Sequence, residues 1–191
     1  MNYKTLLVLV LLLTIGNYGN AQWTLVNLDS TGVFVDLKFF SPDTGYVIGK
    51  RGGTQNGMFV THDGGVSSEF REIPISGSIT LKKMSFPDSL HGFVIGEELH
   101  FAKTTDGGRT WSGAKRVDST YAYDPLHMQF VDSVTGYILV FGEMDNGYKT
   151  TDAGATWTKI DLPSNDGIAA TVTGNIPYRF CFANKNTGFS G

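Results

Sequence analysis

Short runs of apolar and aromatic residues, separated by turns rich in Gly, Asp, Asn and Ser, make up the chain after residue 21. Within these runs the apolar residues do not recur with the 3.6-residue period of an amphipathic helix. Phe130, Tyr137, Leu139 and Phe141 are typical, because they lie in stretches of aromatic and β-branched residues that favour strands. The pattern therefore predicts an all-β fold of short strands with almost no helix.

The first 21 residues have a different pattern. Lys4 is their only charge, residues 6–15 are a nearly unbroken apolar run, and Gly19 and Ala21 are small residues at the −3 and −1 positions of a possible cleavage site. A membrane-spanning helix needs about 20 apolar residues, and this run supplies about half of that. We therefore expect residues 1–21 to be a secretory signal peptide. The mature protein, from residue 22, would be secreted, periplasmic or at the cell surface, with no membrane span.

An aromatic residue, a short polar turn, and a Gly followed by a second aromatic residue recur four times. The four copies are FFSPDTGY at 39–46, FPDSLHGF at 86–93, FVDSVTGY at 130–137 and FANKNTGF at 182–189. We expect Asp88, Asp132 or Asn184 to accept backbone N–H groups inside the turn. The glycines of the same copies, Gly92, Gly136 and Gly188, are expected to take a positive φ before the next strand begins.

A second signature, Thr-x-Asp-x-Gly-x-Thr-Trp, occurs twice and has a third, imperfect copy, in which Ser68 replaces the Trp and Phe70 is the candidate for the aromatic role. We expect the Asp to accept backbone N–H groups across a hairpin, the Gly to permit the reversal, and the Trp to fold over the turn. These residues are predicted to stabilise the fold without contacting a ligand. They are Thr61, Asp63 and Gly65 in the imperfect copy, then Thr104, Asp106, Gly108, Thr110 and Trp111, and finally Thr150, Asp152, Gly154, Thr156 and Trp157.

The two signatures alternate with a period of about 45 residues, which matches one four-stranded antiparallel blade of a β-propeller. The predicted blades are about 34–74, 79–118 and 127–162, and the strands of the second are 80–85, 92–96, 100–105 and 110–117. WTLVNL at 23–28 resembles WTKIDL at 157–162, so 22–28 is expected to be an outer strand, and 177–191 an incomplete blade. A closed propeller has about four to eight blades. We therefore expect a partial ring of about three and a half blades, an open arc from a longer protein, with an unpaired strand edge at 178–191.

TTDGGRTW at 104–111 and TTDAGATW at 150–157 resemble the Asp-box, also called the bacterial neuraminidase repeat. Together with the Phe-x-Asp-x-x-x-Gly turn, they make the mature chain, 22–191, similar to secreted Asp-box propellers of the photosystem II assembly and stability factor type. It is more distantly similar to the sortilin luminal propeller. The resemblance implies the propeller fold and, in the photosystem branch, a chaperone-like docking role. It implies little about chemistry, because both enzymes and binding proteins carry Asp-boxes.

Charge and composition exclude several classes of function. The formal charge is −3, without long charged runs, so the chain lacks the basic stripe that a nucleic acid needs. Cys181 is the only cysteine and cannot form an intramolecular disulfide, and the four histidines are too scattered to predict a metal site. The sequence contains no phosphate-binding loop or dinucleotide fingerprint. We therefore expect no cofactor and no metal.

The expected binding surface is the face of the propeller opposite the Asp-boxes, where the loops from strand two to strand three and from blade to blade lie. Exposed loops of this kind often carry function. We call it the loop face; its loops are 50–57, 96–99, 117–127, 143–147 and 161–177. The candidate ligand-binding residues on it are Arg51, Gln55, Glu97, Glu98, Tyr121, Tyr123, Asp124, Glu143 and Asp145.

The leading hypothesis is a secreted, non-catalytic propeller that binds a protein or a glycan through this face. The alternative is a sialidase-like or xyloglucanase-like glycoside hydrolase whose active site is completed by further blades. Hydrolysis needs two carboxylates about 5–9.5 Å apart, whereas a flat face rimmed by Tyr121, Tyr123 and Arg51 favours protein docking. Sialidases carry an Arg-Ile-Pro stretch before the first Asp-box; here Arg71, with an extra Glu, follows the box, so that role does not carry over.

Overall fold

The computed structural model describes residues 32–141, 146–161, 180–184 and 187–190. Fourteen strands lie in these ranges, with one 3₁₀ turn, η1 (Glu97–Leu99), so the prediction of almost no helix is confirmed for them. The same part of the chain contains no helix long and apolar enough to cross a membrane. The strands are β1 (Val33–Phe39), β2 (Gly45–Arg51), β3 (Gln55–Thr61), β4 (Glu69–Glu72), β5 (Leu81–Ser85), β6 (Gly92–Gly96), β7 (His100–Thr104), β8 (Lys115–Arg116), β9 (Asp124–Phe130), β10 (Gly136–Phe141), β11 (Asn146–Thr150), β12 (Thr158–Asp161), β13 (Phe180–Asn184) and β14 (Thr187–Ser190).

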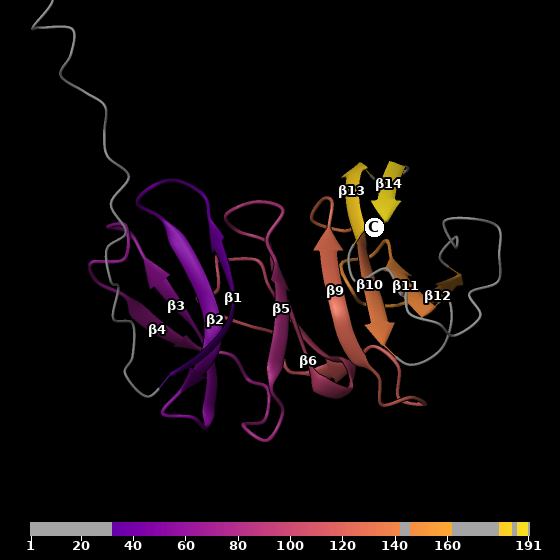
Figure 1. The fold of residues 1–191 in the computed structure, drawn as a ribbon, viewed down its shortest axis with the longest axis horizontal. Coiled ribbons are helices and arrows are strands. Elements are labelled where there is room, and N and C mark those ends of the chain that lie inside the picture. The colour runs from indigo at the N-terminus through magenta and orange to yellow at the C-terminus, as the bar shows by residue number, and fades with distance from the viewer. Residues whose placement is uncertain (1–31, 142–145, 162–179, 185–186, 191) are drawn as a thin grey trace, which may run out of the picture.

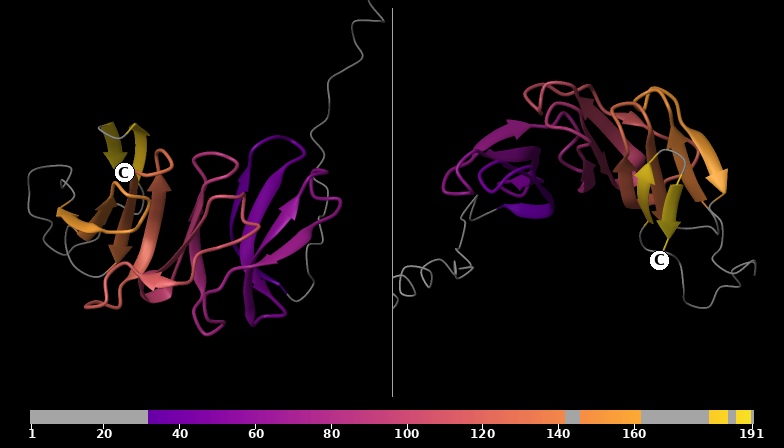
Figure 2. Two further views of the ribbon diagram at one scale, coloured as in Figure 1. Left: turned by 180° about the vertical axis from the view of Figure 1, so that it is seen from behind. Right: turned by 90° about the horizontal axis from the view of Figure 1, so that it is seen from above.

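Three four-stranded antiparallel sheets follow one another along the chain, each with its strands in sequence order. We call β1–β4 blade 1, β5–β8 blade 2 and β9–β12 blade 3. Strands β13 and β14 form a separate pair. The blades stand side by side (Figure 1), and the view from above shows that they follow an arc (Figure 2). The all-β partial propeller is therefore confirmed. The expected signal peptide and the outer strand at 22–28 lie outside the described residues.

Neighbouring blades bury alternate faces of their strands. Tyr46 of blade 1 packs with Phe86 and Val94 of blade 2. In the next interface the ring of Phe93 stacks on that of Phe130, with centroids 3.4 Å apart. The two interfaces are equivalent, because Tyr46 and Phe93 each follow the Gly of the first signature at the start of the second strand of their blade. Blade 2 therefore presents one apolar face to blade 1 and the other to blade 3.

The polar turn before each second strand is held by side-chain acceptors. The N–H groups of Leu90 and His91 donate to Oδ1 of Asp88, both at 2.8 Å, and the N–H groups of the corresponding blade 3 turn donate to Asp132. In blade 1 this role is taken by the Ser41 hydroxyl, which accepts from the turn N–H groups. The predicted Asp acceptors are confirmed at Asp88 and Asp132; the side chain of Asn184 is outside the described residues.

The expected positive φ of Gly92 and Gly136 is wrong: neither glycine is among the residues with positive φ. The glycine is needed because an aromatic ring lies against its Cα. A Cβ built on Gly136 would be 2.6 Å from the ring of Phe130, and one on Gly45 would be 2.7 Å from the ring of Phe39. Real Cβ atoms do not approach a ring so closely. The signature therefore combines an aromatic residue with a Gly because the ring packs on the Gly, and not because the Gly needs a special backbone conformation.

The fourth strand of blade 2 is shorter than expected, since only Lys115–Arg116 of the predicted 110–117 is a strand. Next to it, the N–H of Lys103 donates to the Ser112 hydroxyl at 3.0 Å instead of to a backbone carbonyl. The N–H of Ser112 still donates to the carbonyl of Lys103. The side-chain acceptor interrupts the regular ladder, so β8 covers less of the outer edge of blade 2. The other three strands of this blade begin and end within one residue of the prediction.

Candidate functional site

The three Asp-box turns have the same hydrogen bonds. In each, the first Thr accepts from the Gly N–H, as Thr104 does from Gly108 at 2.9 Å, and the Asp accepts from the next Thr or Ser. Asp106 receives the Thr110 N–H at 2.9 Å and the Thr110 hydroxyl at 2.6 Å. The hydroxyl and N–H of Thr110, with the Thr104 hydroxyl, lower the pKa of Asp106 to about 2. Asp63 and Asp152 have the same lowered pKa of about 2 for the same reason. Each of these carboxylates therefore accepts its hydrogen bonds from residues of its own turn.

The Asp-box turns also connect blades. The Arg71 guanidinium of blade 1 donates to the Gly107 carbonyl in the turn of blade 2 at 3.0 Å, and Lys103 of blade 2 donates to Ala153 in the turn of blade 3. Trp111 packs against the blade 1–blade 2 core and Trp157 against the blade 2–blade 3 core. In blade 1, Phe70 packs on Phe59 with ring centroids 5.0 Å apart. These contacts link each blade to the next, as expected for a motif that stabilises the fold.

On the opposite face, the first strands of blades 2 and 3 bring together three charged groups. Lys82 of β5 contacts Oε1 of Glu97 at 3.0 Å and Oδ2 of Asp124 at 3.9 Å. Oε2 of Glu97 also accepts the N–H of Thr80 at 2.9 Å. The Thr80 N–H and the Lys82 ammonium lower the pKa of Glu97, so its carboxylate stays ionised at neutral pH. The structure thus brings Glu97 and Asp124 together through Lys82, a residue that the sequence analysis did not single out.

The turn that carries Glu97 has an unusual backbone. Glu98 and Leu99 both have φ in the left-handed region, at 53° and 59°, which is rare for residues other than Gly. Leu99 is fully buried, and its carbonyl accepts the Val117 N–H at 3.0 Å. These contacts hold the turn in its strained form and leave the Glu98 side chain exposed.

Arg116 of β8 joins this turn to the loop 117–123. Its Nε donates to the Glu98 carbonyl at 3.1 Å and its Nη2 to the Tyr121 carbonyl at 2.9 Å. The rings of Tyr121 and Tyr123 stack with centroids 5.1 Å apart and an interplanar angle of 12°. The Lys159 ammonium of blade 3 lies 5.4 Å from the Tyr121 centroid. We call Tyr121 and Tyr123 the tyrosine pair; Tyr121 is 41% exposed.

The loop that carries the tyrosine pair is anchored on blade 3. The Tyr148 hydroxyl donates to Oδ2 of Asp118 at 2.9 Å, and the Thr120 N–H donates to Oδ1 at 2.7 Å. Burial and the Asp118 carboxylate raise the pKa of Tyr148. Burial opposes ionisation of Asp118, but these two hydrogen bonds lower its pKa overall. The loop therefore presents the tyrosine pair in a defined position.

The other candidate residues do not join this cluster. Arg51 lies over the Phe70 ring at 5.1 Å, and the Gln55 amide donates to Glu72 at 3.0 Å, both on blade 1. Glu143 and Asp145 lie outside the described residues. Within the described ranges, no group of three or more His, Cys, Asp or Glu side chains could hold a metal ion.

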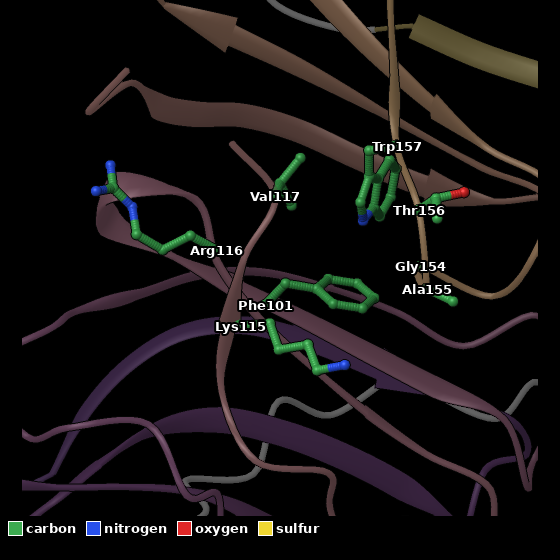
Figure 3. Close-up of a pocket in the computed structure, with 8 residues that line it drawn as sticks. All are labelled: Phe101, Lys115, Arg116, Val117, Gly154, Ala155, Thr156 and Trp157. Atoms are coloured by element: carbon green, nitrogen blue, oxygen red, sulfur yellow. The ribbon is translucent and has the colours of Figure 1, made fainter. Parts of the chain in front are cut away.

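A cavity of about 110 Å³ opens between β7 and β8 of blade 2 and the Asp-box turn of blade 3 (Figure 3). Phe101, Val117 and Trp157 supply apolar atoms to its lining, while β8 and the turn 154–156 complete it, and most of the exposed lining is polar. None of the seven candidate ligand-binding residues that the structure describes lines it. The third Asp-box contributes Gly154, Thr156 and Trp157 to the lining, whereas Asp152 does not take part. No sequence pattern predicts this cavity, because it depends on how two blades meet.

The family model described as photosynthesis system II assembly factor YCF48 matches residues 73–174. A solved structure described as YCF48 bound to D1 peptide is 22% identical, with a TM-score of 0.60, over 74% of this chain and 43% of that chain. YCF48 from Cyanidioschyzon merolae is 25% identical, with a TM-score of 0.56, over 73% and 40%. A GH74 xyloglucanase from Xanthomonas campestris is 13% identical, with a TM-score of 0.57, over 78% and 24%, which shows the shared fold alone.

The comparison with curated proteins found no match. The chain spans less than half the length of the YCF48 structures it resembles. The matched residues run from the end of blade 1 through the whole of blades 2 and 3, and so include both full Asp-box signatures. The resemblance to photosystem II assembly factors inferred from the sequence is therefore confirmed, and the chain belongs to the photosynthesis system II assembly factor YCF48 family.

Proposed function

We propose that this chain is a non-catalytic module that binds a protein partner on the loop face of blades 2 and 3. The observation that carries the proposal is the exposed tyrosine pair, stacked at 5.1 Å and held by Arg116 and Lys159. Tyrosine is enriched in protein interfaces because a rigid ring supplies a large contact area at a low entropic cost. A pair that is ordered before binding loses little further freedom when a partner arrives.

Two further observations support a protein partner. The relative described as YCF48 bound to D1 peptide binds a peptide, and it shares the fold of this chain. The charged groups beside the tyrosine pair, Lys82 with Glu97 and Asp124, can form the polar rim that surrounds the core of an interface.

The geometry gives less support to glycoside hydrolysis. Among the candidate carboxylates that the structure describes, Glu97 and Asp124 are brought together, because both contact the Lys82 ammonium. A catalytic acid needs a raised pKa so that it holds a proton at neutral pH. The pKa of Glu97 is shifted in the opposite direction.

The proposal includes export, on the pattern of residues 1–21. Expression of the full chain in a bacterial host with a general secretion system is expected to release a product that begins at Gln22. Intact-mass measurement of the periplasmic protein gives its first residue. An unprocessed chain that stays in the cytoplasm would contradict this part of the proposal.

Selection of a random peptide library displayed on phage tests the binding function. We expect peptides to be enriched on the unaltered protein and to lose affinity for a variant with Tyr121→Ala and Tyr123→Ala. The matched control is Leu90→Ala with Val134→Ala, because these apolar residues are 51% and 45% exposed and lie in the turns of the opposite face. A glycan array is probed in parallel. Failure to enrich peptides, equal affinities for both double variants, or binding of glycans alone would contradict the proposal.

A further inference from the structure

We propose that the cavity between blades 2 and 3 binds one aliphatic side chain, Leu or Ile, of a peptide whose neighbouring residues are acidic. This inference rests on the proposed protein-binding function and assigns it a second contact, beside the tyrosine pair. The two contacts are continuous, because Arg116 lines the cavity and also donates to the Tyr121 carbonyl.

The cavity exists because the two blade interfaces differ at one pair of positions. In blade 1, Met58 pairs with Arg71, and in blade 2 the corresponding pair is Phe101 with Lys115. Arg71 turns into its interface and donates to the Gly107 carbonyl. The corresponding carbonyl of the next interface accepts instead from Lys103, on a neighbouring strand.

Lys115 is therefore not needed to bridge the two blades and remains exposed. The space that the Arg71 side chain fills between blades 1 and 2 is open between blades 2 and 3. The short β8 adds to this opening, because the outer strand beyond Arg116 ends and Val117 forms the wall.

The size and walls of the cavity suit an aliphatic side chain. Its volume is about 110 Å³, and an apolar cavity of about 150 Å³ is enough to bind benzene. Phe101 and Trp157 stand with their rings 5.4 Å apart at 82°, so they form two walls of a corner, and Val117 lies across from them (Figure 3). An inserted methyl or methylene group would contact these three side chains, which favours its burial, and the polar groups beside it would meet the polar atoms that make up most of the exposed lining.

The charges around the cavity favour an acidic peptide. Lys115, which lines the cavity, takes part in no ion pair found in the described ranges, and neither does Lys159, whose ammonium lies over the Tyr121 ring beside it. The Lys115 ammonium points toward the turn that carries Ala155, and the Arg116 guanidinium points away from the cavity (Figure 3). The nearby carboxylate of Asp118 is occupied by Tyr148 and Thr120. Unneutralised cations at the rim of an interface attract acidic partners and speed their association.

Fluorescence anisotropy with labelled synthetic peptides tests the inference. The probes are acetyl-EELEE-amide, the same peptide with Ala in place of Leu, and the same peptide with Lys in place of every Glu. We expect the leucine peptide to bind at least about tenfold more tightly than the other two, a difference of about 1.4 kcal/mol. Equal affinities for all three, or no binding of the leucine peptide at about 1 mM, would overturn the inference.

Two substitutions place the binding in the cavity. Val117→Phe fills it and Lys115→Glu reverses its charge, and each is expected to weaken the leucine peptide about tenfold. The matched controls are Val66→Phe and Lys38→Glu, both at exposed positions of blade 1, which should leave affinity unchanged. Thermal unfolding of each variant establishes that it is folded.

The same variants separate this inference from the proposed function. If phage-selected peptides need the tyrosine pair but ignore Val117→Phe and Lys115→Glu, the cavity is not a binding site and the protein-binding function stands. If the leucine peptide needs the cavity but no phage-selected peptide needs the tyrosine pair, the proposed loop-face contact is wrong and the cavity stands.

Discussion

The Asp106→Ala variant tests the stabilising role of the Asp-box. The substitution removes a carboxylate that accepts the Thr110 N–H at 2.9 Å, the Thr110 hydroxyl at 2.6 Å and the Thr104 hydroxyl at 2.7 Å. A hydrogen bond to a charged group contributes about 1.5–3 kcal/mol. Because the freed Thr110 groups are exposed and can bind water, we expect a total loss of about 2 kcal/mol.

For a chain of this size, 1 kcal/mol corresponds to about 2–4 °C in Tm, so the expected drop is about 4–8 °C. Differential scanning calorimetry at pH 7 measures it. The control is Asp43→Ala, because no described residue donates a hydrogen bond to the Asp43 carboxylate; its Tm should not change. An unchanged Tm of Asp106→Ala would show that this carboxylate does not stabilise the blade, and loss of peptide binding well below the Tm of the variant would show that it serves binding.

The pH dependence of stability gives a second readout of the same substitution. The pKa of Asp106 is about 2 in the folded protein and about 3.9 in an unfolded chain. The carboxylate therefore contributes its full stabilisation above about pH 4, and the contribution is lost as the pH falls toward 2. Between pH 5 and pH 2, Asp106→Asn should lose less stability than the unaltered protein, as measured by urea unfolding. Parallel curves would mean that the carboxylate is not held as described.

Two further predictions concern packing and the loop. Gly136→Ala places a Cβ 2.6 Å from the ring of Phe130 and should lower unfolding free energy by about 1–3 kcal/mol, whereas Gly113→Ala, with open space around it, should not; equal urea midpoints for the two would contradict the packing argument. Tyr148→Phe removes the hydrogen bond to Asp118 and should speed amide exchange in the loop 117–123 by about fivefold, for a loss of about 1 kcal/mol; unchanged exchange there would show that this bond does not anchor the loop.

Most of the correct predictions concern interactions between residues that are close in the sequence. The Asp-box acceptors, such as Asp106 with Thr110, lie four residues apart, so their hydrogen bonds follow from the turn alone. The blades follow from the period of the two signatures, and the second strand of blade 2 begins and ends at the predicted residues, Gly92–Gly96.

The predictions that failed depend on contacts between distant residues. The sequence pattern predicts a positive φ for the Gly of the first signature. The position requires Gly for another reason: the aromatic ring six residues earlier lies against it once the two strands pair. β8 begins later than predicted because the Ser112 hydroxyl replaces a backbone acceptor in the ladder. Neither contact can be predicted from the strand propensity of the residues.

The candidate site could be predicted only in part. Glu97, Asp124, Tyr121 and Tyr123 follow from the expected loop face, but Lys82 lies on a strand, and its position between the two carboxylates appears only when blades 2 and 3 are packed. The cavity was missed for a related reason. It results from a difference between repeats, because blade 2 has Lys115 where blade 1 has Arg71, whereas the signatures consist of the residues that the repeats share.

We expect two separate roles in this molecule: the Asp-box turns fasten the blades, and a partner binds to the surface of blades 2 and 3. Hydrogen–deuterium exchange of the unaltered protein, with and without a phage-selected peptide, distinguishes the two roles. The bound peptide is expected to slow exchange at 97–99 and 115–123 and to leave exchange in the turns 61–68 and 104–111 unchanged. Protection centred on those two turns, with none at 115–123, would show that the Asp-box turns bind the partner and that the proposed surface does not.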